Sequence, residues 1–227
     1  MTPRRPVTVA IDGPAGSGKS TVSKQVARQL GYAYVDTGAM YRAVALLGMR
    51  AGLAQEDRAG FAAQAAQARM EFRVTEAGQR FLVNGEDCTE AVRDPAVGAR
   101  SSPVSAIPEV RQHLTAAQQR LAAGGGVVME GRDIGTVVCP AAEVKVFVTA
   151  TPPERARRRY LELQAKGKDV TEAEVLAEIT ERDRRDSSRE VAPLRMAEDA
   201  HELVTDGLSI EEVVGRIIDL VREAEAR

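Results

Sequence analysis

The octapeptide GPAGSGKS, residues 13–20, has the residue types and spacing needed to hold a phosphate group. It matches G-x-x-x-x-G-K-[ST], in which backbone N–H groups of the loop and the following helix N-terminus bind the β-phosphate. Lys19 would bridge the β- and γ-phosphates of a nucleoside triphosphate, and Ser20 would be a ligand of Mg²⁺. A glycine-rich turn is the alternative, but the strand-like VTVAI before the loop and the helical TVSKQVARQL after it favour nucleotide binding. The residues expected at the donor phosphates are Gly13, Pro14, Ala15, Gly16, Ser17, Gly18, Lys19, Ser20 and Thr21.

The rest of the chain narrows the class of nucleotide-binding protein. A GTPase needs an Asn-Lys-x-Asp motif to read the base, and the sequence has a single asparagine, Asn84, in a different context. There is no LSGGQ-like signature of transporter ATPases, and no expected strand ends in the acidic pair of motor ATPases. These absences favour a small kinase.

Two segments that follow expected strands carry side chains suited to an acceptor. The carboxyl ends of parallel strands are where α/β proteins bind ligands. DTGAMYR (36–42) brings a hydroxyl, an aromatic ring and a cation, namely Thr37, Tyr41 and Arg42, although a plain helix start would look similar. In EGRDIGTVV (130–138), Arg132 and Asp133 could offer a donor fork and a carboxylate to a cytosine edge, whose amino group donates while N3 and O2 accept. A structural ion pair at the strand end is the alternative there.

The segment ERDRRDSSR (181–189) places charges on a face that begins as apolar. At 100° per residue, three charged side chains continue the stripe set by Val175 and Ile179. Burying such charges is costly unless they pair with each other or with an ionic ligand. They face a ligand, or else the helix end emerges into water. The three residues are Arg182, Asp186 and Arg189.

A second cationic run, RARRRYLELQAKGK (155–168), follows another expected strand. Such a run is ordinarily a solvated face. Its position after a strand of the nucleotide-binding core also suits a lid that closes over the donor phosphates.

Alternating strands and helices must position these residues. Strands are expected at 7–11, 32–36, 126–131, 144–150 and 202–206, with helices between them. A closing helix from about Ser209 should bury one face, made of Ile210, Val213, Val214, Ile217 and Ile218. This pattern predicts an α/β fold with a parallel sheet covered by helices on both sides.

One stretch breaks the alternation. Residues 71–89 read as an antiparallel hairpin with turns at 76–78 and 84–85, which indicates an inserted subdomain at about 62–100. The chain of 227 residues is then one kinase domain, with a core of 1–61 and 101–227 and a lid at about 152–170.

Composition excludes several classes of protein. A net charge of −2 gives no reason to expect nucleic acid or an anionic membrane as partner, and no segment has the roughly 18 apolar residues of a membrane span. The start of the chain lacks a signal-peptide core. Cys88 and Cys139 have neither metal nor redox spacing. We therefore expect a soluble, cytoplasmic chain.

Together these segments resemble the bacterial cytidylate kinase family of P-loop nucleoside monophosphate kinases. GPAGSGKS, DTGAMYR, PEVR (108–111), EGRDIGTVV, the RARRR–KG segment, ERDRRDSSR and VAPL (191–194) follow the family's order and approximate spacing over about residues 6–220. The resemblance implies transfer of the γ-phosphate of ATP to CMP or dCMP, with Mg²⁺. We also expect a monomer. It also implies a P-loop core, an inserted monophosphate-binding subdomain and a short lid.

The resemblance assigns a role to each matching position. It implies that Ser102, Arg111 and Asp133 read cytosine, that Arg42 and Arg132 bind phosphate, and that Thr37 and Tyr41 line the acceptor site. It implies that Arg182, Asp186 and Arg189 hold the sugar and phosphate, and that Arg155, Arg158 and Arg159 belong to the lid. Of these, Lys19, Arg132, Arg158, Arg159 and Arg182 are the expected catalytic residues and Arg155 an expected ATP-binding residue. A small-molecule kinase with another acceptor and a non-catalytic ATP-sensing module remain the alternatives.

Overall fold

The computed structural model describes residues 5–76 and 78–226, which form two compact units. Among these residues, the first unit consists of 5–34 with 122–226, and the second of 35–76 with 78–121.

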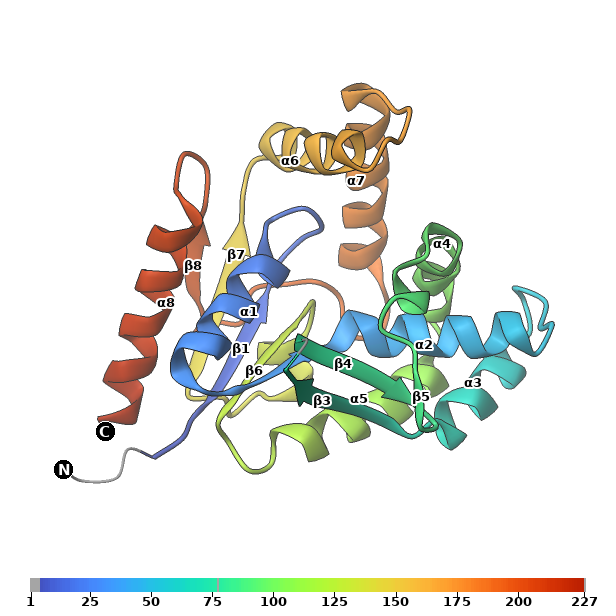
Figure 1. Cartoon of the computed structure of the whole chain (residues 1–227), viewed down its shortest axis with the longest axis horizontal. Helices are drawn as coiled ribbons and strands as arrows, with labels where there is room; N and C mark the ends of the chain where they lie inside the picture. Colours follow the sequence, from blue (N-terminus) through green and yellow to red (C-terminus); the bar gives the residue numbers. More distant parts are fainter. Residues whose placement is uncertain (1–4, 77, 227) are drawn as a thin grey trace. The chain divides into compact units, whose positions relative to one another are not determined.

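A five-stranded sheet with the order β2-β6-β1-β7-β8 forms the centre of the first unit (Figure 1). The registered pairs β1–β6, β1–β7 and β7–β8 are all parallel, as the alternation of strands and helices predicts. All five expected strands are present, at Thr8–Asp12 (β1), Ala33–Asp36 (β2), Val127–Gly131 (β6), Val144–Thr149 (β7) and His201–Val204 (β8).

Two helices, α1 (Lys19–Leu30) and α8 (Ile210–Glu225), lie side by side and bury their apolar faces against this sheet (Figure 1). Valines of β1 and β7 meet Val22 and Val26 of α1 and the 213/214/217/218 face of α8 in one core cluster. Ser209 begins α8 with a capping box, as its position before the apolar run suggests. Ile210, however, is 43% exposed, and the prediction that it shares the buried face is wrong. Helical side chains lean toward the preceding turn, and the first residue of a helix has no preceding turn on which its side chain could pack, so Ile210 stays exposed.

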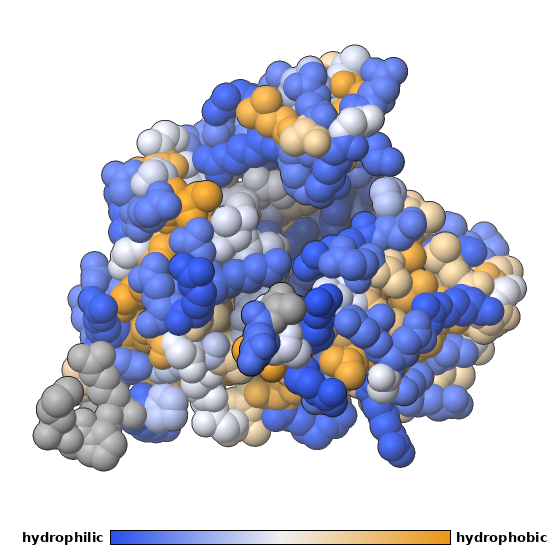
Figure 2. All heavy atoms as spheres, in the orientation of Figure 1, coloured by the Kyte–Doolittle hydropathy of each residue, from blue (hydrophilic) through white to orange (hydrophobic). Residues whose placement is uncertain are grey.

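The helix pair α6 (Pro152–Ala165) and α7 (Glu172–Ser188) follows β7. Ala156 meets Val175 and Ile179 in a small separate core, with Tyr160 and Leu163 packed around it. The arginine run therefore lies on α6 itself, and the outer surface of this pair is mostly hydrophilic in Figure 2. Between β6 and β7 lies the five-residue π-helix η2 (Ile134–Val138).

The second unit is built from helices and a small antiparallel sheet. Its strands, with the order β3-β4-β5, are Met70–Thr75 (β3), Gly78–Val83 (β4) and Glu86–Asp87 (β5). The antiparallel hairpin predicted at 71–89 is confirmed, although Ala77 of its first turn lies outside the described residues. The surrounding helices are α2 (Thr37–Arg50), α3 (Arg58–Gln67), η1 (Ala91–Arg93), α4 (Pro95–Val104) and α5 (Pro108–Ala122). The boundaries 62–100 for an insertion and 152–170 for a lid stay predictions.

None of the helices among the described residues is long and apolar enough to cross a membrane.

Candidate active site

The loop between β1 and α1 has the geometry of a phosphate cradle. Gly16 and Gly18 both have positive φ, of 75° and 85°, and Gly18 is the N-cap of α1 without any side-chain cap. The first N–H groups of the helix are thus left to an anion rather than to a capping side chain. Gly13 has φ 147°, and a Cβ there would lie 2.0 Å from the carbonyl oxygen of Val148 in β7. Only glycine permits this close approach, which brings the loop down onto the sheet.

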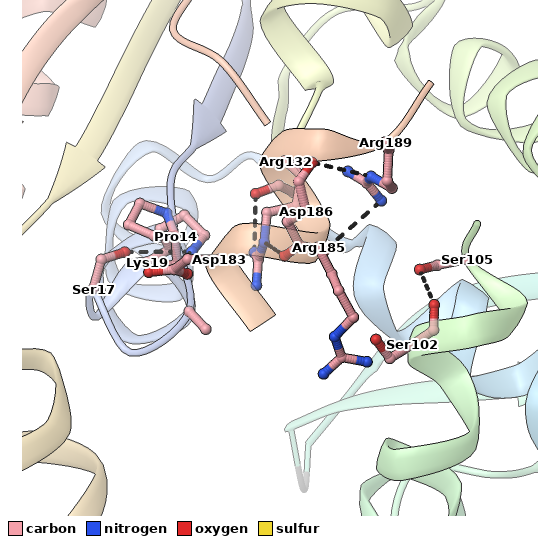
Figure 3. Close-up of polar contacts among 12 residues, drawn as sticks. Pro14, Ser17, Lys19, Ser102, Ser105, Arg132, Asp183, Arg185, Asp186 and Arg189 are labelled. Atoms are coloured by element: carbon pink, nitrogen blue, oxygen red, sulfur yellow. Dashed lines mark hydrogen bonds and ion pairs between the residues drawn. The ribbon is translucent and has the colours of Figure 1, made fainter. Parts of the chain in front are cut away.

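Lys19 lies inside this loop. Its side chain is buried, and Nζ donates to the carbonyl of Pro14 at 2.6 Å and to Ser17 Oγ at 3.3 Å (Figure 3). Burial lowers the pKa of Lys19 well below its ordinary value, and the charge of Arg132 lowers this pKa further, while Glu130 opposes the change. Arg182 acts in the same direction as Arg132. The lysine of the phosphate loop therefore feels two of the predicted acceptor-side arginines, which is an arrangement suited to bringing anions together.

The stripe on α7 is an ion-pair cluster. Arg132 Nε donates to Asp186 Oδ2 at 2.8 Å, and the Arg189 guanidinium lies 4.0 Å from Asp186 Oδ1 (Figure 3). These side chains are between 10% and 19% exposed. Burial opposes ionisation of Asp186, yet the charge and hydrogen bond of Arg132, with Arg189 and Arg182 behind it, hold the pKa of this carboxyl below its ordinary value. One carboxylate is thus surrounded by three cations, and the excess positive charge is available to an anion.

The neighbouring charges of ERDRRDSSR are used differently. Arg184 and Glu181 pair with each other on the exposed side of α7. Asp183 instead contacts Arg155 of α6 at 2.6 Å. Glu181, Asp183 and Arg184 therefore point away from the Arg182–Asp186–Arg189 stripe, as the helical spacing predicts.

The three predicted lid arginines differ in their surroundings. Arg155 is buried and donates to the carbonyls of Ala150 and of Ala15 in the phosphate loop, both at 2.9 Å. Arg158 donates to Glu154 and, through its two Nη atoms, to the Oγ1 and carbonyl of Thr205 at 2.9 and 2.8 Å. Arg159 is 43% exposed and pairs with Glu162 one turn further along α6. Arg155 thus links α6 to the phosphate loop, while Arg158 is held at the end of β8.

The predicted acceptor residues of the second unit gather around the start of α2. Asp36 caps this helix by accepting from Ala39 N at 2.9 Å, and its other oxygen accepts from Arg42 at 2.8 Å. Within the part of the chain that the structure describes, Arg42 Nε is buried and has no hydrogen-bond partner. Arg111 lies over the Tyr41 ring, 5.3 Å from its centroid. Buried Thr37 opens α2, and half-buried Ser102 lies on α4.

Each unit therefore brings together its own share of the predicted site residues. Lys19, Arg132, Arg182, Asp186 and Arg189 come together in the first unit. In the second unit Arg111 meets Tyr41, while Arg42 pairs with Asp36.

Sequence reasoning missed two participants, Asp12 and Thr205, and considered Asp36 only as a possible helix cap, without its ion pair to Arg42. Asp12 could have been noticed as a carboxyl ending an otherwise apolar strand. No local signal marks Thr205. No group of three or more histidine, cysteine or acidic side chains among residues 5–76 and 78–226 could hold a metal ion. Ser20, exposed at the start of α1, is the oxygen donor expected for Mg²⁺, which in kinases takes few protein ligands beside phosphates.

Comparison with known proteins agrees with this geometry. The family model for cytidylate kinase matches residues 9–223. The chain is 50% identical over 222 residues to a cytidylate kinase of Geobacter sulfurreducens, covering 98% of this chain and 95% of that protein. It is 52% identical to a bifunctional pantoate ligase/cytidylate kinase of Synechococcus elongatus, covering 97% of this chain but only 42% of that longer protein. A solved structure of an uncharacterised protein from Eubacterium ventriosum, 12% identical, has a TM-score of 0.52 and covers 96% of this chain and 98% of its own, which supports the fold alone.

Proposed function

We propose a residue-level mechanism from one premise: the chain belongs to the cytidylate kinase family. It is an ATP-dependent kinase that transfers the γ-phosphate of ATP to CMP, giving ADP and CDP. We extend the acceptors to dCMP, and propose a cytoplasmic monomer. The observation that carries the mechanism is that the charges of Arg132 and Arg182 act on Lys19 and lower its pKa, which brings the positive charge of the phosphate loop and that of the arginine cluster to the same region of the first unit.

On the donor side, the N–H groups of the loop and of the start of α1 bind the β-phosphate, and Lys19 spans the β- and γ-phosphates. To reach them, the lysine exchanges its bonds to Pro14 and Ser17 for phosphate oxygens. Ser20 would hold Mg²⁺, which when bound would supply positive charge to the phosphate oxygens. Arg155 stabilises the loop conformation by donating a hydrogen bond to the carbonyl of Ala15.

On the acceptor side, Arg42 and Arg132 bind the phosphate of CMP. The unpartnered, buried Nε of Arg42 and the charge excess around Asp186 both favour an anionic ligand. Asp133 accepts from the cytosine amino group, while Arg111 and Ser102 donate to the ring acceptors. Thr37 and Tyr41 line the site, with the Tyr41 ring keeping Arg111 in place.

Catalysis needs positioning and charge neutralisation more than proton transfer. Phosphoryl transfer passes through a loose transition state, and the attacking phosphate oxygen of CMP is already ionised near pH 7, since its second pKa is about 6. No general base is required. Lys19, Arg132 and Arg182 offset the repulsion between two polyanions, with Asp186 and Arg189 holding the sugar and phosphate of CMP.

The lid arginines complete the charge on the transferring phosphate. Arg158 and Arg159 lie on α6, one turn beyond the buried anchor Arg155. Arg158 would leave Thr205 to contact the phosphate, and Arg159 would leave its exposed pair with Glu162. Both exchanges replace contacts that are at least partly solvated, so each costs little.

A coupled assay of ADP formation tests the function. Purified protein is given ATP and Mg²⁺ with CMP, dCMP, UMP, AMP or GMP, and Lys19→Met serves as the inactive control. We expect turnover with CMP and dCMP well above the others. Equal kcat/KM for AMP or GMP, or ATP binding with no turnover of any acceptor, would contradict the proposal.

A further inference from the structure

Asp12 is a buried carboxylate with no role in the mechanism above. It ends β1, directly before Gly13 of the phosphate loop, and is 5% exposed. Its Oδ1 accepts from Ile134 N at 2.8 Å and its Oδ2 from Gly135 N at 2.7 Å. We propose that Asp12 is a positioning residue, whose carboxylate fixes the turn carrying Arg132 and Asp133 in register with the phosphate loop. The inference rests on the proposed function.

Folding of β1 does not itself call for an acid at this position. The strand is paired along its length with β6 and β7, and its other four residues are buried. Burial raises the pKa of Asp12 to about 6, despite the opposing hydrogen bonds from Gly135 and Ile134. A carboxylate kept ionised at this cost at neutral pH must contribute something that an apolar side chain would not.

That contribution is a cap for the π-helix η2. At its start the carbonyl of Asp133 accepts from Val137 N and Val138 N, so the turn closes on its own backbone. The N–H groups of Ile134 and Gly135 have no acceptor within the turn, and Asp12 takes both. π-Helical turns are rare and are often found at functional sites.

The neighbours of Gly135 leave room for this contact. A Cβ on it would lie 3.5 Å from Asp12 Oδ2, an ordinary contact distance, and 3.3 Å from Lys145 Cδ, which is tighter than most real contacts. Lys19 and Asp133 are the charged groups that act on Asp12, and the Cys139 thiol feels its charge in turn.

One carboxylate thus connects both halves of the reaction in the first unit. Gly13 follows Asp12 in the chain, while Arg132 and Asp133 directly precede the two N–H groups that it holds. A small displacement of this turn would move Arg132 away from Lys19, and would move the Asp133 carboxylate away from the cytosine amino group of CMP. Misplacement on the scale of an ångström can cost about a hundredfold in rate.

The test is Asp12→Asn, which keeps shape but replaces one acceptor by an N–H that faces another N–H. We expect a fall of about tenfold or more in kcat/KM for CMP and a smaller preference for CMP over UMP, with KM for ATP within about threefold of wild type. Glu143→Gln is the matched control, since Glu143 accepts from Thr8 N at the opposite end of β1. It should leave every kinetic constant unchanged.

A purely structural role predicts something else. Asp12→Asn would then lower the unfolding midpoint while the folded protein keeps wild-type constants for both substrates, and that result overturns the inference. If Asp12→Asn does not fold, Asp12→Glu carries the test, since it keeps the carboxylate but lengthens the side chain and so displaces the two N–H groups that Asp12 holds. Unchanged kinetic constants for CMP in that variant overturn the inference equally. Amide resonances of Ile134 and Gly135 in the wild type should titrate together near pH 6. Wild type without turnover of CMP would instead defeat the proposed function.

Discussion

Replacing Asp186 by asparagine should weaken both the fold and the reaction. The carboxylate accepts from Arg132 at 2.8 Å, lies 4.0 Å from Arg189 and is 11% exposed. Breaking a fully buried pair costs about 3–5 kcal/mol. Asparagine keeps an acceptor and Arg132 is 19% exposed, so we expect a loss of about 1–3 kcal/mol in the free energy of unfolding. The lost charge also leaves Arg132, Arg182 and Arg189 facing one another.

The pKa of Asp186 determines how this loss depends on pH. Although burial opposes ionisation, Arg132 and its neighbours hold the folded pKa below the unfolded value, which is about 3.9. The stabilisation is therefore present above the unfolded pKa and is lost as the pH falls through the folded pKa. Wild type and variant should differ most at neutral pH and converge in acid.

Urea unfolding and steady-state kinetics on the same preparations provide the assay. A double-mutant cycle of Asp186→Asn with Arg132→Met should give a coupling of about 1–3 kcal/mol in the free energy of unfolding. In the Asp186 variant, kcat/KM for CMP should fall by an amount that corresponds to about 2–4 kcal/mol of lost transition-state stabilisation. Added CMP should restore part of the stability, since an anion binds the excess cations. Additive effects in the cycle would refute the pairing. A variant that unfolds early but turns over normally per folded molecule would refute the role in binding CMP.

Asp133→Ala should narrow the preference for CMP over UMP, mainly by losing CMP activity, because uracil offers an acceptor where cytosine has an amino donor. This difference is worth about 1–3 kcal/mol, and equal kcat/KM values for CMP and UMP in the wild type would contradict the assignment of Asp133. Arg158→Ala and Arg159→Ala should lower kcat with little change in CMP binding. Arg157 is an exposed neighbour that pairs with Glu154, and Arg157→Ala should leave kcat unchanged. Wild-type turnover in the first two variants would mean that the arginines of α6 form only a solvated surface. The pKa of Asp12 is raised from 3.8 to about 6 in the folded protein, which corresponds to about 3 kcal/mol of stability. This stability is present below pH 3.8 and is lost as the pH rises through 6. The free energy of unfolding of the wild type, measured relative to Asp12→Asn, should therefore fall between about pH 4 and 7.

Local sequence determined the strands and helices and which side chains share a face. The loop between β1 and α1 depends on glycines whose backbone angles and close approach admit no other residue, so a short motif specifies it. The hairpin at 71–89 and the buried face of α8 follow from periodicity, because each is set by residues a few positions apart. The same reasoning separates the inward stripe Arg182–Asp186–Arg189 from the outward Glu181 and Arg184.

Tertiary structure decided which charges meet. Asp186 faces Arg132 from 54 positions away, Arg158 is held by Thr205 from 47, and Asp12 caps a turn 122 positions further along the chain. Helical spacing places a side chain on a face but does not name the partner, and Ile210 shows that it does not even ensure burial at a helix end. Parallel strands bring together segments that are distant in sequence. The contacts between residues at the ends of these strands therefore depend on the strand order β2-β6-β1-β7-β8, which is set by the tertiary structure.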